Sequence, residues 1–123
     1  MIPRLAAHFL ARMARGFPII AITGPRQSGK STLARETFPR HPYVTLEDPD
    51  TRRLALADPR RFLARFPHGA VLDEVQRAPE VLSYLQGRVD AAQRAGEFVV
   101  TGSQQFGLMS GITQSLADRK SVV

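Results

Sequence analysis

Short apolar runs alternate along the chain with segments in which apolar residues recur every three or four positions. The runs predict buried strands, and the segments with apolar residues at every third or fourth position predict amphipathic helices. We expect strands at residues 18–23, 43–46, 69–74 and 97–101, and helices at about 2–16, 30–37, 59–66, 79–96 and 106–117, with a further helix opened by Pro49. Strands that alternate with helices indicate an α/β domain whose parallel sheet is covered on both faces.

Asp-Pro pairs mark the starts of two of these helices. Asp48 precedes Pro49, and Asp58 precedes Pro59. An Asp side chain that accepts from the first turn, followed by Pro inside that turn, is a common helix start. We therefore interpret Asp48, Asp50 and Asp58 as capping residues rather than as metal ligands.

The first sixteen residues form a basic amphipathic segment. Apolar residues recur there at helical spacing, and the arginines fall largely on the opposite face. Such a helix can lie on a membrane or belong to a transit peptide, but this one contains no serine, so packing on the following domain is favoured. We expect an N-terminal helix at residues 1–16 and an α/β domain at residues 17–123.

A glycine-rich segment joins the first strand to the next helix. Residues 24–31 read Gly-Pro-Arg-Gln-Ser-Gly-Lys-Ser and fit G-x-x-x-x-G-K-[ST], the pattern of a phosphate-binding loop. Gly24 and Gly29 permit backbone angles in which successive N–H groups point inward, and the helix start adds positive potential. An ordinary Gly-rich turn is the alternative, but the strand before the loop and the helix after it favour nucleotide binding.

The residues of this loop have distinct expected roles. Lys30 reaches the β- and γ-phosphates, and Ser31 offers its hydroxyl to Mg²⁺. The other expected nucleotide-binding residues are Gly24, Pro25, Arg26, Gln27, Ser28, Gly29 and Thr32. The loop predicts a bound nucleoside triphosphate and, less directly, its hydrolysis.

Polar residues also follow the third and fourth strands. Asp73 can hold Mg²⁺, directly or through water, and Glu74 can orient and polarise the attacking water. Ser103 or Gln104 can contact the γ-phosphate as a sensor, although Ser103 can equally cap a helix. Because ligands of parallel sheets bind at the carboxyl ends of the strands, we expect these residues to meet the loop there.

Composition and charge narrow the remaining possibilities. The sequence has no cysteine, which excludes disulfides and thiolate metal sites and agrees with a reducing cytoplasm. No apolar run is long enough to span a membrane. The net charge is +6, and residues 1–40 hold seven Lys or Arg and one acid. This excess suits a polyanionic nucleotide, and a nucleic-acid surface is the less favoured alternative.

Four motifs, in this order, resemble those of a known family. They are Ile-Thr-Gly-Pro-Arg-Gln-Ser-Gly-Lys-Ser at 22–31, Leu-Glu-Asp-Pro-Asp at 46–50, Leu-Asp-Glu-Val-Gln-Arg-Ala-Pro at 72–79 and Thr-Gly-Ser-Gln-Gln at 101–105. From residue 2 to about 119 the chain resembles the prokaryotic AAA-type P-loop ATPases that carry an uncharacterised C-terminal domain, the AAA_14 and DUF4143 pairing. The resemblance implies ATP with Mg²⁺, a sheet in the order 5-1-4-3-2, and the roles given above for Lys30, Ser31, Asp73 and Glu74.

The sequence departs from that family near Arg119. The resemblance implies that an arginine here can reach the γ-phosphate of a neighbouring subunit in a homo-oligomer, whereas a cation at a helix end is the simpler interpretation. The family usually has Leu-Ala-Gly-Arg, and this chain has Leu-Ala-Asp-Arg at 116–119. Relatives continue into a fifth strand and a second domain. We therefore expect a truncated product without strand 5, whose first strand forms an apolar, aggregation-prone sheet edge of marginal stability.

Motifs and resemblance together favour Mg²⁺-dependent ATP hydrolysis by a cytoplasmic AAA-type domain. The expected catalytic residues are Glu74, Lys30, Ser103, Gln104 and Arg119. One alternative is a nucleotide-binding module that truncation has left without turnover. Another is a phosphotransferase on the same scaffold, but that reaction needs an acceptor pocket and an Arg-bearing lid, and the two acids after the third strand fit hydrolysis better.

Overall fold

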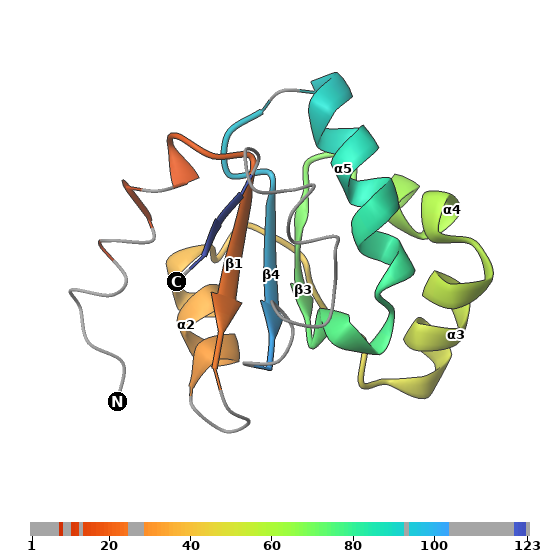
Figure 1. Cartoon of the computed structure of the whole chain (residues 1–123). Coiled ribbons are helices and arrows are strands. Elements are labelled where there is room, and N and C mark those ends of the chain that lie inside the picture. Colours follow the sequence, from red (N-terminus) through yellow and green to blue (C-terminus); the bar gives the residue numbers. More distant parts are fainter. Residues whose placement is uncertain are drawn as a thin grey trace.

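A parallel β-sheet forms the centre of the structure, a computed structural model that describes residues 8, 11–12, 14–24, 29–92, 94–103 and 120–122 (Figure 1). Its strands are β1 (Ile19–Thr23), β2 (Tyr43–Thr45), β3 (Ala70–Asp73), β4 (Phe98–Gly102) and β5 (Lys120–Val122). They lie in the order β2-β3-β4-β1-β5, and every neighbouring pair is parallel. The α/β class and the strand order predicted from the sequence are confirmed.

Helices connect the strands at nearly the predicted positions. They are α2 (Lys30–Thr37), α3 (Pro49–Ala57), α4 (Pro59–Ala64), the 3-10 helix η1 (Val75–Arg77) and α5 (Glu80–Ala92). Both Asp-Pro starts are confirmed, because Asp48 accepts from the N–H of Thr51 at 2.9 Å and Asp58 accepts from the N–H of Arg61 at 3.0 Å. These caps satisfy N–H groups that the first turn of a helix leaves unpaired.

The sheet is covered on both faces, as the alternation of strands and helices predicted. Along β1, Ile19 and Ala21 belong to a core shared with α3, α4 and α5, whereas Ile20 and Ile22 belong to a second core with Leu33 of α2. Figure 1 shows α2 on one side of the sheet and α3, α4 and α5 on the other. A strand buried on both faces reads as a continuous apolar run, which explains the uninterrupted sequence of β1.

The prediction that strand 5 is missing is wrong. Residues Lys120–Val122 form β5 and pair in parallel with Ile19–Ala21 of β1. Strand β1 therefore lies between β4 and β5. The backbone of β5 pairs with N–H and C=O groups of β1 that would be unpaired if β1 were an edge strand. The apolar edge expected at β1 does not form, so the aggregation and marginal stability predicted from that edge lose their physical basis.

Some predicted elements lie outside the described residues. This holds for the helix at 106–117 and for most of the N-terminal helix, of which residues 8, 11, 12 and 14 are described and helical. The division into parts at 1–16 and 17–123 stays a prediction. Within the described ranges, no helix combines the length and hydropathy needed to cross a membrane.

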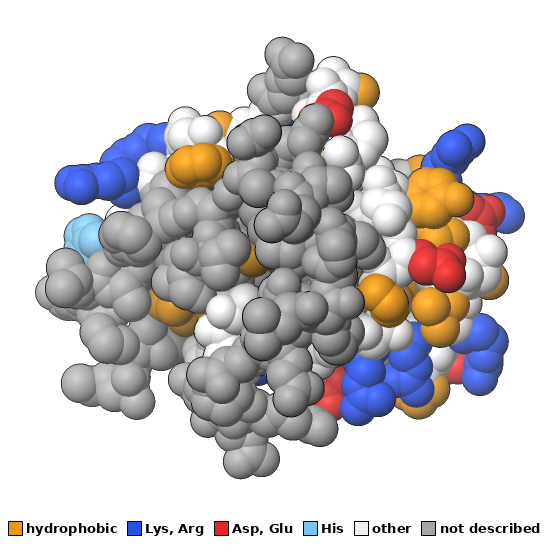
Figure 2. All heavy atoms as spheres, viewed as in Figure 1, with side chains coloured by type: hydrophobic (Ala, Val, Ile, Leu, Met, Phe, Trp, Pro, Cys, Tyr) orange, Lys and Arg blue, Asp and Glu red, His pale blue; other side chains and the backbone are white. Residues whose placement is uncertain are grey.

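The helices α3, α4 and α5 form a side of the molecule with mixed surface charge. Figure 2, viewed as in Figure 1, shows Lys and Arg side chains there beside acidic and hydrophobic ones. One of these charges is already paired at the surface, since Arg53 lies 3.3 Å from Asp50. A nucleic-acid surface needs a concentration of positive charge, so this side does not favour one, and the nucleic-acid surface considered for residues 1–40 stays a prediction.

Candidate functional site at the carboxyl ends of the strands

The described residues of the glycine-rich segment lie between the carboxyl end of β1 and the start of α2. The N–H of Gly24 donates to the carbonyl of Gly102 at the end of β4, at 3.2 Å. Gly29, directly before α2, has φ 85° and ψ 7°, a left-handed conformation that favours glycine. Lys30 and Ser31 are the first residues of α2, so both lie where the helix dipole favours an anion.

Ser31 and Asp73 come into direct contact across the sheet end. Ser31 Oγ donates a hydrogen bond to Asp73 Oδ1. Thr101 Oγ1 donates to the same oxygen at 2.6 Å, and the hydroxyl of Tyr43 donates to Asp73 Oδ2 at 2.9 Å. Three hydroxyl groups, carried by α2, β4 and β2, therefore hold one carboxylate in place.

These hydrogen bonds decide the charge state of Asp73. Burial opposes the negative charge, but hydrogen bonds from Ser31, Thr101 and Tyr43 outweigh it, so the pKa of Asp73 is lowered from its ordinary value. Burial, followed by the hydrogen bond to Asp73 and the charge of Asp73, raises the pKa of Tyr43 to about 12. At neutral pH, Asp73 is thus a carboxylate and Tyr43 is a neutral donor.

The oxygen atoms at this position fit a magnesium ion. Ser31 Oγ and the carboxylate of Asp73 are hard oxygen donors that already meet at one point, and Mg²⁺ prefers such ligands. Among the described residues, no cluster of three or more His, Asp or Glu side chains forms a metal cage. In nucleotide sites Mg²⁺ is usually bound through one or two protein ligands, with phosphates and water completing its shell.

Glu74 lies between Lys30 and Gln76. Its Oε2 is 3.5 Å from Lys30 Nζ, and its Oε1 accepts from Gln76 Nε2 at 2.9 Å. The side chains of Lys30 and Glu74 are only 5% and 7% exposed. The backbone of Glu74 is left-handed, with φ 53° and ψ 52°, and its N–H donates to Thr101 Oγ1 at 3.0 Å. Left-handed residues other than glycine are uncommon and concentrate at functional sites.

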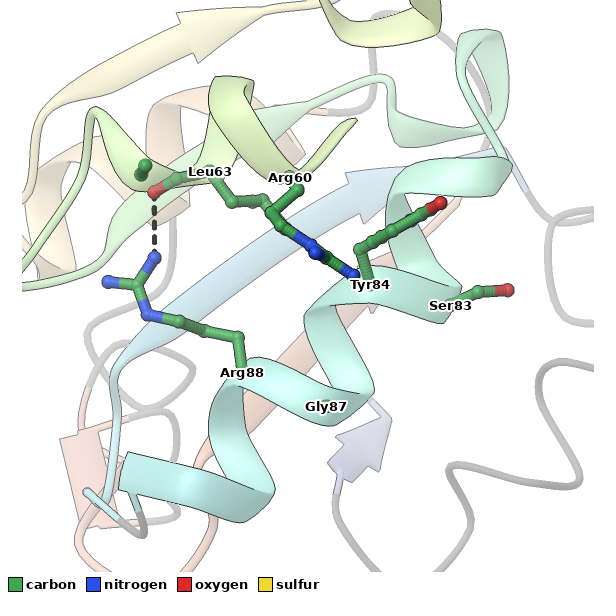
Figure 3. Close-up of a pocket in the computed structure, with 7 residues that line it drawn as sticks. Arg60, Leu63, Ser83, Tyr84, Gly87 and Arg88 are labelled. Carbon is green, nitrogen blue, oxygen red and sulfur yellow. Dashed lines mark hydrogen bonds between the residues drawn. The ribbon is translucent and has the colours of Figure 1, made fainter. Parts of the chain in front are cut away.

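A separate groove lies between α4 and α5. It has a volume of about 500 Å³, and its lining includes Arg60, Leu63, Ser83, Tyr84, Gly87 and Arg88. Figure 3 shows Arg60 extending from α4 toward Tyr84 on α5. Arg88 donates to the carbonyl of Leu63, and the distance between donor and acceptor is 2.7 Å. None of these lining residues belongs to the set around Asp73, so the groove is not part of the candidate phosphate site.

Comparison with known proteins assigns the sequence to a family. The profile of the AAA_14 family, described as an AAA domain, matches residues 16–123. The chain belongs to the AAA_14 family. This AAA_14 chain is 36% identical to uncharacterised proteins of Mycobacterium bovis and Mycobacterium tuberculosis, in matches that cover 98% of the chain and 27% of each relative. The chain thus spans little more than a quarter of the length of these relatives.

A solved structure agrees with the fold of the AAA_14 chain. The crystal structure of a DNA replication initiation factor matches it with a TM-score of 0.66 and 14% sequence identity, over 100% of this chain and 46% of that one. At this low identity the likeness supports the fold alone. A P-loop-type α/β domain is therefore supported by the family and by the structural match.

Several predicted site residues of the AAA_14 chain meet at one end of the sheet, and others lie elsewhere. Those that meet are Gly24, Gly29, Lys30, Ser31, Asp73 and Glu74. Thr32 is exposed on α2, and Ser103 directly follows β4. Pro25, Arg26, Gln27, Ser28, Gln104 and Arg119 lie outside the described residues.

Tyr43, Gln76 and Thr101 belong to the site but were not predicted as site residues. Thr101 is a buried hydroxyl in an otherwise apolar strand, and that was a usable signal, because buried polar groups are paired. Gln76 stands two positions after Glu74, within one of the four motifs. Tyr43 gave no such signal, since an aromatic residue in a strand is ordinary packing.

Proposed function

We propose that this AAA_14 domain binds Mg²⁺·ATP at the loop that ends in Lys30 and hydrolyses the γ-phosphate bond. One observation carries the proposal. Lys30, the contact between Ser31 and Asp73, and the buried carboxylate of Glu74 all meet at one sheet end. A cation, a pair of magnesium-type oxygens and a proton acceptor are the groups that triphosphate hydrolysis needs.

Lys30 and the N-terminus of α2 are suited to bind the phosphates. In the structure, Lys30 lies 3.5 Å from Glu74, so the carboxylate of Glu74 occupies a place beside the ammonium that a phosphate oxygen could take. Lys30 would exchange this carboxylate for phosphate. Both partners are anionic, but the phosphates would also be attracted by the positive end of the α2 dipole. Glu74 Oε2 would then be available to a water molecule.

Ser31 and Asp73 would hold the magnesium ion. When bound, the ion supplies Lewis-acid polarisation of the phosphoryl oxygens. The hydroxyls of Thr101 and Tyr43 keep the carboxylate of Asp73 oriented and charged. Glu74 orients the water and takes its proton, the role of a general base, which contributes on the order of a hundredfold or more to the rate.

A nucleotide-binding module without turnover is the second candidate function. The contact between Lys30 and Glu74 favours it, since a general base that stays paired with a lysine cannot accept a proton from water. The two candidates make the same prediction for binding and opposite predictions for hydrolysis.

The family resemblance leads us to propose several finer features. These are a Ser103 or Gln104 sensor, an Arg119 that reaches a neighbouring subunit in a homo-oligomer, a DUF4143 domain in the same protein, and a cytoplasmic location. The match to only 27% of each relative is compatible with a domain that works inside a longer protein.

The test combines binding and single-turnover measurements. Lys30→Ala should weaken affinity for Mg²⁺·ATP by about a hundredfold, since it removes a buried charge-assisted contact. Arg40→Ala, on an exposed turn after α2, is the control and should bind normally. Unchanged affinity in the Lys30 variant would refute the proposal.

Hydrolysis separates the two candidates. Under single-turnover conditions, Glu74→Gln should lower the rate at least about a hundredfold while ATP still binds. Equal and negligible rates in wild type and variant, with ATP bound in both, would favour the module without turnover.

A further inference from the structure

Gln76 has one buried polar atom without a hydrogen-bond partner in the part of the chain that the structure describes. Its Nε2 donates to Glu74 Oε1 at 2.9 Å. Its Oε1 is buried and has no hydrogen-bond partner among the described residues. Buried acceptors in native proteins are almost always paired, and an exception calls for a water molecule or a ligand. This oxygen therefore belongs to a side chain that is already hydrogen-bonded to Glu74, the proposed general base.

The backbone holds Glu74 and Gln76 in a fixed relation. Glu74 is left-handed, its N–H donates to Thr101 Oγ1, and its carbonyl accepts from the N–H of Arg77 at 3.1 Å to close the turn. Gln76 lies inside the 3-10 helix that this turn begins. This hydrogen-bonded turn therefore sets the backbone positions from which the two side chains meet.

We propose that Gln76 is a positioning residue that shares the attacking water with Glu74. The inference rests on the proposed hydrolysis. Gln76 Nε2 holds one carboxylate oxygen of Glu74, and Gln76 Oε1 accepts a hydrogen bond from the water. Glu74 takes one proton of that water while the water oxygen bonds to the γ-phosphorus. At the same time the bond between the γ-phosphorus and the bridging oxygen breaks, and ADP leaves with that oxygen. Gln76 itself neither gains nor loses a proton.

The amide suits this position because it is neutral and has both a donor and an acceptor. A carboxylate at position 76 would keep the acceptor but lose the donor, and it would place a second negative charge beside Glu74. A methionine would fill a similar volume with neither group. Gln76→Glu and Gln76→Met therefore remove different parts of the proposed interaction while largely preserving the packing.

The experiment compares two phosphate analogues in the same variant. ADP with beryllium fluoride imitates the bound triphosphate, whereas ADP with aluminium fluoride imitates the flat phosphoryl group together with the attacking water. In Gln76→Met, we expect affinity for the beryllium complex within about twofold of wild type. Affinity for the aluminium complex, and the single-turnover rate, should fall roughly tenfold to a hundredfold, the scale of a lost hydrogen bond to a charged group. Gln76→Glu should also lower the single-turnover rate, because it loses the donor to Glu74 and adds a negative charge beside it.

The control is Gln86→Met, the same substitution on α5, which should match wild type in both affinities. A Gln76→Met variant that loses both affinities equally would show a merely structural role and overturn the inference. Unchanged affinities would overturn it as well. Wild-type protein that fails to bind the beryllium complex would instead refute the proposed function itself, and the inference with it.

Discussion

The hydroxyl of Thr101 donates a hydrogen bond to Oδ1 of Asp73 at 2.6 Å. The same hydroxyl accepts from the N–H of Glu74 at 3.0 Å, and Thr101 has no exposed surface. One side chain on β4 thus fixes both the acid that ends β3 and the left-handed turn that follows it. The relative position of the proposed magnesium ligand and the proposed general base depends on a residue that would touch neither magnesium nor water.

Thr101→Val tests this dependence. Valine has nearly the same shape, but it leaves the N–H of Glu74 without its acceptor and Asp73 without one donor. We expect a loss of about 2 to 4 kcal/mol in the free energy of unfolding, since an unsatisfied buried group costs about 1 to 3 kcal/mol and two groups are affected. Urea denaturation followed by circular dichroism measures this loss.

Thr101→Ser is the matched control. It keeps the hydroxyl and removes only a methyl group, so a loss of about 1 kcal/mol is expected from the small cavity. If serine and valine at this position proved equally destabilising, packing and not hydrogen bonding would explain the role of Thr101.

The site residues that could be predicted from the sequence belong to short continuous motifs. The loop at 24–31 and the pair Asp73-Glu74 each combine a recognisable pattern with an apolar strand directly before it. Strand β5 could not be predicted in this way, because Lys120–Val122 is too short to show a period.

The contacts of Thr101 and Tyr43 depend on sheet register, which the sequence does not show. Asp73 is 28 positions from Thr101 and 30 from Tyr43. Only the pairing of β3 with β4 on one side and with β2 on the other brings the three side chains together. The pattern of apolar and polar residues within one strand does not show which residues of other strands lie beside it. The observed register shows this directly.

Tyr43 should ionise at an unusually high pH. A tyrosine in the unfolded chain has a pKa of about 10, whereas burial and the neighbouring Asp73 raise the pKa of Tyr43 to about 12. A raised folded pKa stabilises the neutral form, so this contribution to stability is complete below about pH 10 and is lost as pH rises toward about 12. Ultraviolet difference titration of wild type against Tyr43→Phe should show a midpoint near the raised value.

The Asp73→Asn variant tests whether the charge of Asp73 contributes to the raised pKa of Tyr43. The variant removes the negative charge that disfavours tyrosinate, so the Tyr43 midpoint should move down toward its ordinary value while the contribution from burial remains. A wild-type midpoint at the ordinary value would mean that Tyr43 does not donate to Asp73 in solution.

Gly69 should be nearly irreplaceable. Its φ is 92°, and an added Cβ would lie 1.7 Å from the carbonyl oxygen of Glu97. Gly69→Ala must therefore move the backbone at the start of β3, and we expect a loss above about 3 kcal/mol or failure to fold. Thermal and urea unfolding measure the effect.

Gly87→Ala is the contrasting substitution at a glycine with free space. Gly87 lies within α5, and an added Cβ would meet no heavy atom within 4 Å apart from its neighbours along the helix. Alanine should stabilise the protein by up to about 1 kcal/mol, the difference in helix propensity. Equal destabilisation by both substitutions would contradict the close approach of Gly69 to the carbonyl of Glu97.

Arg88 joins the end of α4 to a buried acid before β4. Its guanidinium donates to the carbonyl of Leu63 at 2.7 Å and to the carbonyl of Phe66, and it lies 3.4 Å from Glu97. The Glu97 side chain is only 1% exposed. Arg88→Met should cost about 3 kcal/mol in the free energy of unfolding. It removes one charged partner of the buried Glu97 carboxylate and a charged donor from two carbonyls, each of which keeps a backbone N–H donor.

A comparison of Arg94 with Arg88 shows whether burial or distance decides how much each arginine contributes to stability. Arg94 lies nearer to Glu97, at 2.7 Å, but its side chain is 50% exposed. Water can replace much of an exposed partner, so Arg94→Met should cost only about 1 kcal/mol despite the shorter distance. Adding Glu97→Gln to Arg88→Met should recover part of the loss, since a neutral amide needs no buried cation. Equal costs for Arg88→Met and Arg94→Met, with no recovery, would show that Arg88 acts by packing alone.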